Sequence, residues 1–395
     1  QLSLTEEEVA QLVRHLWELR GVGFDYFYFD ENCSYQLLSL IEAARPSLKL
    51  KKRFSNWVIP VDTVRVLLEN EGILEEVEFR PARATVLRAR AEALPKELRE
   101  RAELLARGEQ VNLASYAMRD AAHTLELAYE FLNYQILSST ERRDELRQRA
   151  HRLLAERSKL TTGVPEFEVP TPPVRPDEGH LTSRLGFQLG NASGTPFYNL
   201  QYRGAYHDIL DPPNGFIPGA AIELMTTTLQ HREKSSFKLE ELKFLDARAL
   251  SPRGSFIKPI SWMLQAGLRR KLVREERPLV SHVNGGVGLT FNIGPIMPYS
   301  LFRLTGELSG NYRDNIALGF GGRSGALITL SERLGVLVEG EALRFGVGDD
   351  HNSYFLQTEG RFTLNRNWSL RAKYRRERGL HSDEHQFTLG TDVFF

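Results

Sequence analysis

The chain has 395 residues, with 51 Lys and Arg against 51 Asp and Glu, and a single cysteine, Cys33. This balance gives no bulk electrostatic attraction for nucleic acid, and one cysteine excludes an internal disulfide. The mean hydropathy is polar, and no apolar run reaches the roughly 18 residues of a transmembrane helix. A search for long apolar runs does not detect a transmembrane β-barrel, because each of its strands is only half apolar. The length is sufficient for two domains.

The first 160 residues predict helices. Thr5 and Glu8 have the spacing of a capping box, and apolar residues recur at helical spacing after them as far as Gly21. The charged composition of the last helical stretch indicates a solvated surface. Further elements are expected as helices at 34–44, 61–70 and 97–156, and as a short aromatic strand at 24–29.

Residues 164–177 contain five prolines and read as a stiff, extended linker. The linker separates two expected domains. We expect a domain at 1–160, a Pro-rich linker at 161–178 and a second domain at 179–395.

After the linker the apolar period changes from helical to two, which is typical of strands with one apolar and one polar face. About twelve such strands are expected, and an even number of strands is typical of a bacterial outer-membrane barrel. A soluble β-sandwich is the alternative. The expected strands lie near 181–190, 198–207, 220–230, 237–249, 260–269, 283–293, 302–309, 315–330, 334–347, 354–362, 368–375 and 386–395.

The last strand favours the membrane. Phe387, Leu389, Val393 and Phe395 share one face with Thr391, while the other face is mostly polar. A chain that ends on an aromatic residue in such a strand resembles the insertion signal of bacterial outer-membrane proteins. An exported protein begins with a signal peptide, and none stands at Gln1, so we expect this chain to be mature, trimmed or incomplete at its start.

The strand period also predicts which charges face the barrel interior. Opposite charges in a narrow lumen should pair and fill it, so a plugged anchor is expected rather than an open pore, although charge rings can also tune a channel. The side chains predicted to point inward are Arg184, Arg203, Arg269, Arg303, Glu307, Glu339, Glu341, Glu359, Arg361, Arg371, Lys373 and Arg375.

Cys33 stands at the first turn of the helix expected at 34–44. The free N–H groups and positive end of a helix stabilise a thiolate, which is how papain-like enzymes present a nucleophile. Asp30 and Asn32 can cap the helix and, with Ser34, line a substrate or oxyanion region. The alternative is a buried structural cysteine, because free Cys is among the most buried residue types.

The run from Phe29 to Tyr35 (Phe-Asp-Glu-Asn-Cys-Ser-Tyr), with Leu37-Leu38 and 42–46 (Glu-Ala-Ala-Arg-Pro) after it, resembles the signature of the Lnb-type periplasmic domain family. That family is named for a lipoprotein N-acyltransferase, and its thiol domain resembles the permuted papain-like fold of NlpC-type enzymes. In its Gram-negative branch such domains precede a C-terminal barrel. The expected fold class is therefore α + β: the helical part of a papain-like thiol domain, then an antiparallel transmembrane β-barrel of about 12 strands in the outer membrane, with the N-terminal domain in the periplasm.

The resemblance implies attack of the Cys33 thiolate on an acyl or amide carbonyl, a thioester intermediate, and transfer to water or an amine. The activating histidine of such enzymes lies upstream of the cysteine. Here only His15 precedes Cys33, on a charged helix, and His123 falls on an apolar helix face that indicates a core position. We therefore expect the chain to begin inside the thiol domain, with its upstream segment before Gln1 or on a separate chain.

Three functions are compatible with these patterns: a cysteine acyltransferase or hydrolase anchored in the outer membrane, a channel or secretion barrel with a helical periplasmic plug or adaptor, and a non-catalytic envelope assembly protein. Outer-membrane lipids are the expected partners of all three. Lipoproteins or peptidoglycan are the substrates that the first would meet. No cofactor, metal or nucleic acid is expected.

Overall fold

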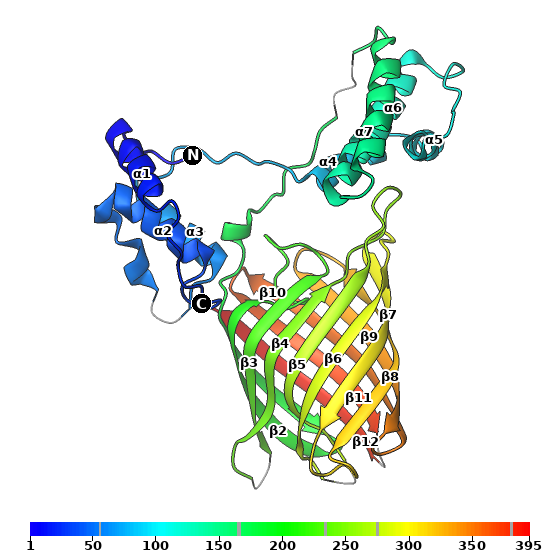
Figure 1. Ribbon diagram of the computed structural model, residues 1–395. Helices are drawn as coiled ribbons and strands as arrows, with labels where there is room; N and C mark the ends of the chain where they lie inside the picture. The colour runs from blue at the N-terminus through cyan, green and yellow to red at the C-terminus, as the bar shows by residue number, and fades with distance from the viewer. Residues whose placement is uncertain (55–56, 164–166, 233–234, 274–275, 380–381) are drawn as a thin grey trace. The chain divides into compact units, whose positions relative to one another are not determined.

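The computed structural model describes residues 1–54, 57–163, 167–232, 235–273, 276–379 and 382–395 (Figure 1). Pro165, in the predicted linker, lies outside the described residues. The chain divides into two compact units. Unit 1 comprises 1–78, 173–252 and 260–395, and unit 2 comprises 79–172 and 253–259.

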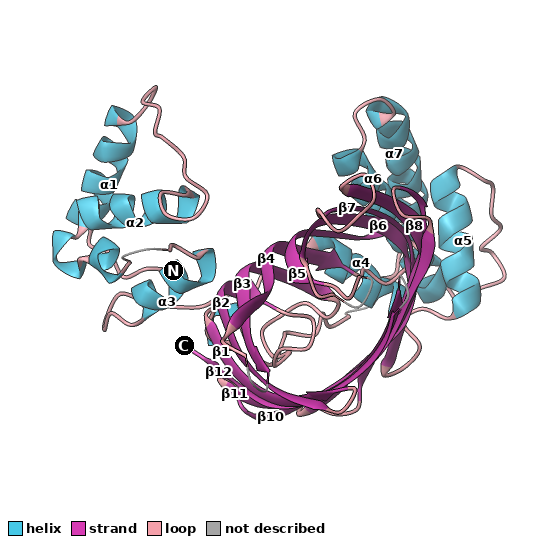
Figure 2. Ribbon diagram, turned by 90° about the horizontal axis from the view of Figure 1, so that it is seen from below, coloured by secondary structure: helices cyan, strands magenta, loops and turns pink. Residues whose placement is uncertain are grey.

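Unit 1 contains a closed antiparallel barrel, in which every strand pairs with its sequence neighbour and β1 pairs with β12 (Figure 2). The prediction of a helical N-terminal part followed by an antiparallel barrel of about twelve strands is confirmed. The strands are β1 Arg184–Ala192, β2 Thr195–His207, β3 Ala220–Arg232, β4 Lys238–Ala249, β5 Ser261–Arg270, β6 Leu279–Thr290, β7 Ile296–Leu308, β8 Ile316–Thr329, β9 Leu334–Val347, β10 His351–Asn365, β11 Trp368–Gly379 and β12 Ser382–Phe394.

The period-two pattern of the sequence produces the two faces of the barrel wall. On β12, Phe387, Leu389 and Val393 are exposed on the outer face, whereas Phe394 is 2% exposed and points inward. Glycine permits close approach of the strands at Gly321, where a Cβ atom would lie 1.9 Å from the carbonyl oxygen of Ala342 on β9. The inward charges that the sequence predicted are buried or half-buried, as expected.

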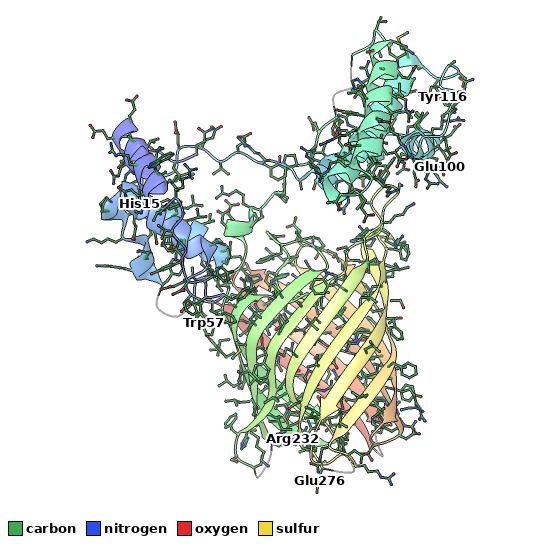
Figure 3. The ribbon with its side chains drawn as sticks, viewed as in Figure 1. His15, Trp57, Glu100, Tyr116, Arg232 and Glu276 are labelled. Atoms are coloured by element: carbon green, nitrogen blue, oxygen red, sulfur yellow. The ribbon has the colours of Figure 1, made fainter. Side chains whose placement is uncertain are left out.

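The chain enters and leaves the barrel at the same end, here called the entry end. Ser183 and Phe395 exchange backbone hydrogen bonds of 3.2 and 3.0 Å there. The two long connections, 208–219 between β2 and β3 and 250–260 between β4 and β5, also lie at the entry end. The opposite rim, the far end, carries Arg232 and Glu276 (Figure 3).

The N-terminal part of unit 1 contains α1 (Glu6–Glu18), α2 (Cys33–Ala44) and α3 (Pro60–Leu68), with short 3-10 turns at Pro46–Leu48 and Leu50–Arg53. The predicted capping box starts α1, because Thr5 and Glu8 bond to each other's backbone N–H. The prediction of a strand at 24–29 was wrong. This segment has no strand partner among the described residues, so its aromatic side chains remain exposed.

Helix α3 joins this N-terminal part to the barrel. Ile59, just before α3, packs with Ala205 of β2 and Leu224 of β3 in one buried apolar cluster. From α3, Arg65 donates to the carbonyl oxygens of Asp177, Gly179 and His180 at 2.8, 3.2 and 2.9 Å. The helix therefore fixes the segment through which the chain enters β1.

Unit 2 is a helical bundle of α4 (Arg83–Glu92), α5 (Lys96–Arg107), α6 (Met118–Ser138) and α7 (Arg143–Ser158). Helix α4 was not expected, because its Arg-rich sequence reads as a solvated loop. Residues 253–259 from the β4–β5 connection belong to this bundle: Phe256 is 7% exposed in its core, with its ring centroid 5.1 Å from that of Phe131. No helix in the described residues is both long and apolar enough to cross a membrane.

Candidate functional site

Cys33 is exposed, as a nucleophile must be. It is the first residue of α2, and the preceding Asn32 is the N-cap. Asn32 is itself buried, because its side-chain amide donates to the carbonyl oxygens of Val58 at 2.6 Å and Tyr28 at 3.3 Å. The buried cap fixes the direction of the helix start, so that the thiol points to solvent at the positive end of the helix dipole.

The predicted oxyanion region is partly occupied. The Oδ1 atom of Asn32 accepts hydrogen bonds from the backbone N–H groups of Ser34 at 3.1 Å and Tyr35 at 3.3 Å. Those donors are engaged in capping and are not free to bind an oxyanion. Among the first amides of the helix, the N–H of Cys33 itself remains. Asp30 is exposed and accepts from the N–H of Glu31 at 2.8 Å.

The described residues give Cys33 no general base. Its sulfur has no hydrogen-bond partner within the part of the chain that the structure describes. His15 interacts with Glu18, one turn further along α1, at 3.3 Å. His123 lies in unit 2, 6% exposed, and burial lowers its pKa. Within the described residues, neither histidine makes a hydrogen bond to the Cys33 thiol.

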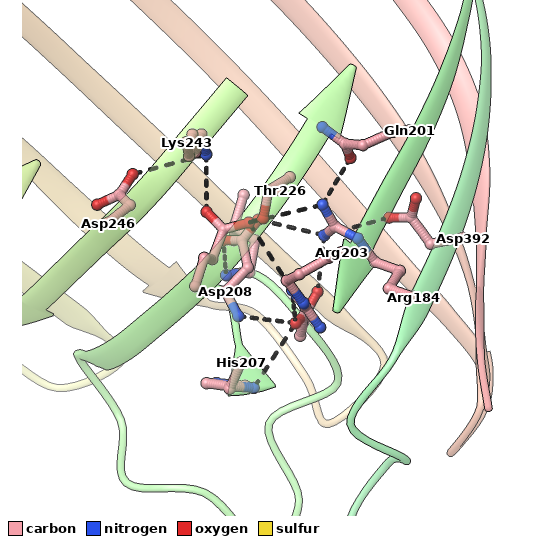
Figure 4. Close-up of polar contacts among 12 residues, drawn as sticks. Arg184, Gln201, Arg203, His207, Asp208, Thr226, Lys243, Asp246 and Asp392 are labelled. Atoms are coloured by element: carbon pink, nitrogen blue, oxygen red, sulfur yellow. Dashed lines mark hydrogen bonds and ion pairs between the residues drawn. The ribbon is translucent and has the colours of Figure 1, made fainter. Parts of the chain in front are cut away.

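A second site is formed by the β2–β3 connection, here called the plug loop (208–219). Its first residues fold into the lumen and form a tight turn, in which the N–H of Asp208 donates to Asp211 at 2.7 Å. The Asp211 carboxylate accepts from Arg371 of β11 at 2.6 Å and from Arg184 of β1 at 3.1 Å. It also lies 2.6 Å from the guanidinium of Arg203 on β2. Figure 4 shows the surrounding polar contacts.

The same turn also contacts the side of the barrel wall that lies across the lumen from β1, β2 and β11. Leu210, between the two aspartates, is 2% exposed and packs in a buried apolar cluster on inward positions of β5, β7, β8 and β9. Carboxylates therefore hold the turn to β1, β2 and β11, and one leucine seals it against the other side. The cluster around Leu210 contains Leu250, Met263, Met297, Tyr299, Leu301, Leu327 and Leu337.

A stack of rings backs the plug loop at the entry end. Phe216 of the loop lies 4.0 Å from His207 and 4.4 Å from His180, measured between ring centroids. The carbonyl of Leu181 accepts from the Nδ1–H of His180 at 2.7 Å, so the neutral ring presents a bare Nε2 atom to His207 Nδ1 at 2.8 Å. Burial lowers the pKa of His180 to about 4, although the nearby Asp211 opposes the shift.

His180, His207 and Asp211 are the described group whose donor atoms lie close enough to share a metal ion. The surroundings argue against a cation. Asp211 already contacts three guanidinium groups, and the two histidine nitrogens that would face the ion are bonded to each other. A divalent ion would meet three positive charges for one carboxylate. We therefore interpret the cluster as a latch that holds the plug loop.

Beyond the plug loop the lumen contains a cavity of about 280 Å³, lined from Asp208 and Leu210 to Arg277 and Glu384 at the far end. Its wall carries many charged side chains among uncharged polar and a few apolar ones. Some ion pairs cross the lumen: the guanidinium group of Arg248 on β4 lies 3.4 Å from the carboxylate of Glu339 on β9. The cavity is thus a polar vestibule that reaches toward the far end and is closed by the plug loop at the entry end.

Comparison with known families places the three parts of the chain. Residues 173–394, more than half of the chain, match a family described as a domain of unknown function (DUF7840). The chain belongs to this family. Residues 77–169 match a second domain of unknown function (DUF7842), and residues 1–70 match the Lnb N-terminal periplasmic domain. The protein is an outer-membrane barrel with a periplasmic N-terminal domain, so the entry end faces the periplasm.

Among solved structures, the barrel is similar to the KdgM porin in complex with disordered oligogalacturonate, at 10% identity over 54% of this chain and 99% of that chain with a TM-score of 0.33. It is also similar to the NanC porin, at 7% identity over 53% and 99% with a TM-score of 0.34. A third is an outer membrane channel from Pseudomonas putida F1, at 7% identity over 59% and 100% with a TM-score of 0.35. These distant likenesses assign neither a ligand nor a function. No curated protein matches the chain.

The role of the plug loop was not predicted from the sequence, whereas Cys33 was singled out by its place at a helix start. Asp211-Pro212-Pro213-Asn214-Gly215 reads as ordinary turn chemistry. The available signal was length, because 12 residues between two strands is long for a barrel turn and long connections often carry function.

Proposed function

We propose that this protein is a gated outer-membrane channel, closed from the periplasmic side by the plug loop and opened when that loop leaves the lumen. The observation that carries the proposal is the polar vestibule that ends at Asp208 and Leu210. Its charged lining is compatible with small polar or charged solutes, since such walls replace part of their hydration shell.

The closure is thin, which supports a gate. Between the vestibule and the periplasm stand the Asp208–Asp211 turn, one leucine and a ring stack, rather than a folded domain. The turn is fixed by ion pairs to Arg184, Arg203 and Arg371 and by the burial of one apolar side chain, Leu210. In water the charged groups regain hydration. A loop held in this way can leave the lumen at a smaller cost than one anchored by a large apolar core.

The test is conductance in planar bilayers, with the wild-type chain and a variant in which 209–218 is replaced by a short Gly-Ser turn. The wild type should be silent or open rarely, and the loop-replaced barrel should show a stable single-channel conductance. A folded loop-replaced barrel that stays silent would show that the barrel is a filled anchor.

The second candidate function is a cysteine-dependent acyl transfer or hydrolysis in the N-terminal domain, with a papain-like fold around Cys33. The exposed thiol at a capped helix start favours it. The missing base and the engaged Ser34 and Tyr35 amides mean that the described residues do not form a complete catalytic site. Lipoproteins, lipid acyl chains and peptidoglycan amides are the proposed substrates.

This candidate predicts that an acyl-thioester probe labels the full-length protein in isolated outer membranes and that Cys33→Ser abolishes the labelling. Ser39→Ala, on the same helix, serves as the matched control. If the thiol reacts with a small alkylating reagent but never with the acyl probe, the enzyme hypothesis fails while the channel proposal is unaffected.

A further inference from the structure

The outer face of β10, β11 and β12 is layered along the membrane normal. Near the periplasmic end β11 exposes Trp368, and it then presents Leu370 and Ala372 before Tyr374. On the neighbouring strands Tyr354 and Phe387 occupy positions directly opposite Arg378 and Tyr374 of β11. Two aromatic girdles with an aliphatic band between them mark the two edges of the hydrocarbon layer.

Two arginines stand immediately beyond the outer girdle. Arg376 and Arg378 follow Tyr374 at alternate positions of β11, so they point out of the barrel and not into the lumen. Arg376 and Arg378 lie eight and ten residues after Trp368. At about 3.4 Å per residue and a tilt of about 40°, they stand roughly 21 and 26 Å along the normal from Trp368, against an apolar band about 25 Å tall. The two guanidinium groups are therefore at the outer edge of the apolar band, within reach of the outer-leaflet headgroups.

Two more side chains, one histidine and one arginine, lie nearby on the outer face. His385 of β12 is opposite Arg376 and within hydrogen-bond distance of the Tyr374 hydroxyl, 2.9 Å away. Arg344 of β9 is 48% exposed and pairs with Asp350. We call Arg344, Arg376, Arg378 and His385 the outer basic patch.

The acidic groups within the patch do not neutralise it. Asp383 is opposite Arg378 in register but takes both of its hydrogen bonds, of 3.1 and 2.7 Å, from Arg376. Within the described residues Arg378 makes no hydrogen bond or ion pair. Three arginines thus face two carboxylates. Arg378 interacts with Asp383 only through its charge, so its N–H groups can bind an anion bidentately.

We propose that the outer basic patch binds the phosphorylated sugar headgroup of an outer-leaflet glycolipid, of the lipopolysaccharide type. Three features of the site select this ligand. The arginines point to lipid, they lie at headgroup height on the outward side of the barrel, and Tyr354 and Tyr374 beside them offer flat amphipathic surfaces for a sugar ring. The proposal is independent of whether the barrel conducts.

The test is native mass spectrometry of the full chain in detergent, titrated with purified diphosphoryl lipid A. Each arginine near an anionic headgroup should contribute about fivefold in affinity, so Arg376→Gln with Arg378→Gln should weaken binding by about 25-fold. The matched control is Arg333→Gln with Arg366→Gln, which removes two exposed arginines from turns at the periplasmic end. It should bind like the wild type.

A gain-of-binding variant guards against a fold defect in the double substitution. Asp383→Asn removes the carboxylate that engages Arg376 and should bind lipid A several-fold more tightly than the wild type. Dephosphorylated lipid A should bind as weakly as lipid A binds the double variant, and millimolar inorganic phosphate should not compete.

Equal affinity of the double variant, the control and the wild type would overturn the proposal. Binding of dephosphorylated lipid A as tight as that of the diphosphoryl form would do so as well, because contact with acyl chains would then suffice. Full competition by inorganic phosphate would identify a free-anion site in place of a lipid site.

Discussion

Substitution of Asp211 by Asn tests the gate most directly. The carboxylate lies in the lumen, fully buried, within 3.1 Å of three guanidinium groups. Asparagine keeps the size of the side chain but removes the charge and turns one acceptor oxygen into a donor that faces arginine. The closed loop should lose its main polar support, while the strand ladders around it stay intact.

The magnitude follows from the burial. Removing one partner from a buried ion pair costs about 3–5 kcal/mol, because the remaining charge is left without compensation. If the loop regains water when it opens, that cost falls on the closed state. The ratio of open to closed barrels should then rise by about 150-fold to a few thousand-fold.

The assay is single-channel recording at fixed pH and salt, with folding checked by heat-modifiable migration on gels. Asp314→Asn, in the exposed turn between β7 and β8, is the matched control and should behave like the wild type. If Asp211→Asn folds and its open probability equals that of the wild type, the plug loop is a permanent filling and the gating argument is wrong.

Four further outcomes are expected. The pKa of His180 falls from 6.5 in the unfolded chain to about 4 in the closed state, so the open state binds more protons between these values. The closed state should therefore lose about 3 kcal/mol as pH falls from 6.5 to 4. Conductance should rise on acidification, and His180→Gln should reduce the rise. Leu210→Ala should favour opening by about 2–5 kcal/mol through the lost apolar contact, measured by open probability. Phe256→Ala should destabilise unit 2 by about 3–5 kcal/mol, seen as a lower denaturant midpoint of the helical signal in circular dichroism. Asn32→Ala should lower the stability of the N-terminal domain by about 1 kcal/mol or more and raise the alkylation rate of Cys33, because the helix start loosens; an unchanged rate would mean that the cap does not position the thiol.

The barrel was predictable because its rule is local. In β12, alternate residues face lipid and lumen, and Phe394 could be placed inside by counting back from Phe395. The same alternation identified Arg184, Arg203 and Arg371 as inward groups before any partner was known. Strand pairing with sequence neighbours adds no long-range choice, so the period and the turns determine the topology.

The contacts that close the lumen were not predictable in this way. Asp211 reaches Arg371, 160 positions later in the chain, and no periodicity links the two. Phe256 reads as a loop residue and is buried only because residues 253–259 join the bundle of unit 2. The strand expected at 24–29 has the right composition but no partner in the described residues, which shows that β-propensity alone does not make a ladder.

The two proposed functions make different demands on buried charge. A barrel that serves only as an anchor could fill its lumen with apolar side chains, since replacing buried ion pairs by well-packed hydrophobic residues is often neutral or stabilising. Here the closing turn is instead held by Asp211 and three arginines, groups that water can solvate again when the turn leaves. Hydration of these groups in the open state offsets part of the free energy of opening. At Cys33 the opposite holds, because the Asn32 cap consumes the amides that an oxyanion would need. The described residues therefore fit the proposed gate better than they fit the proposed enzyme.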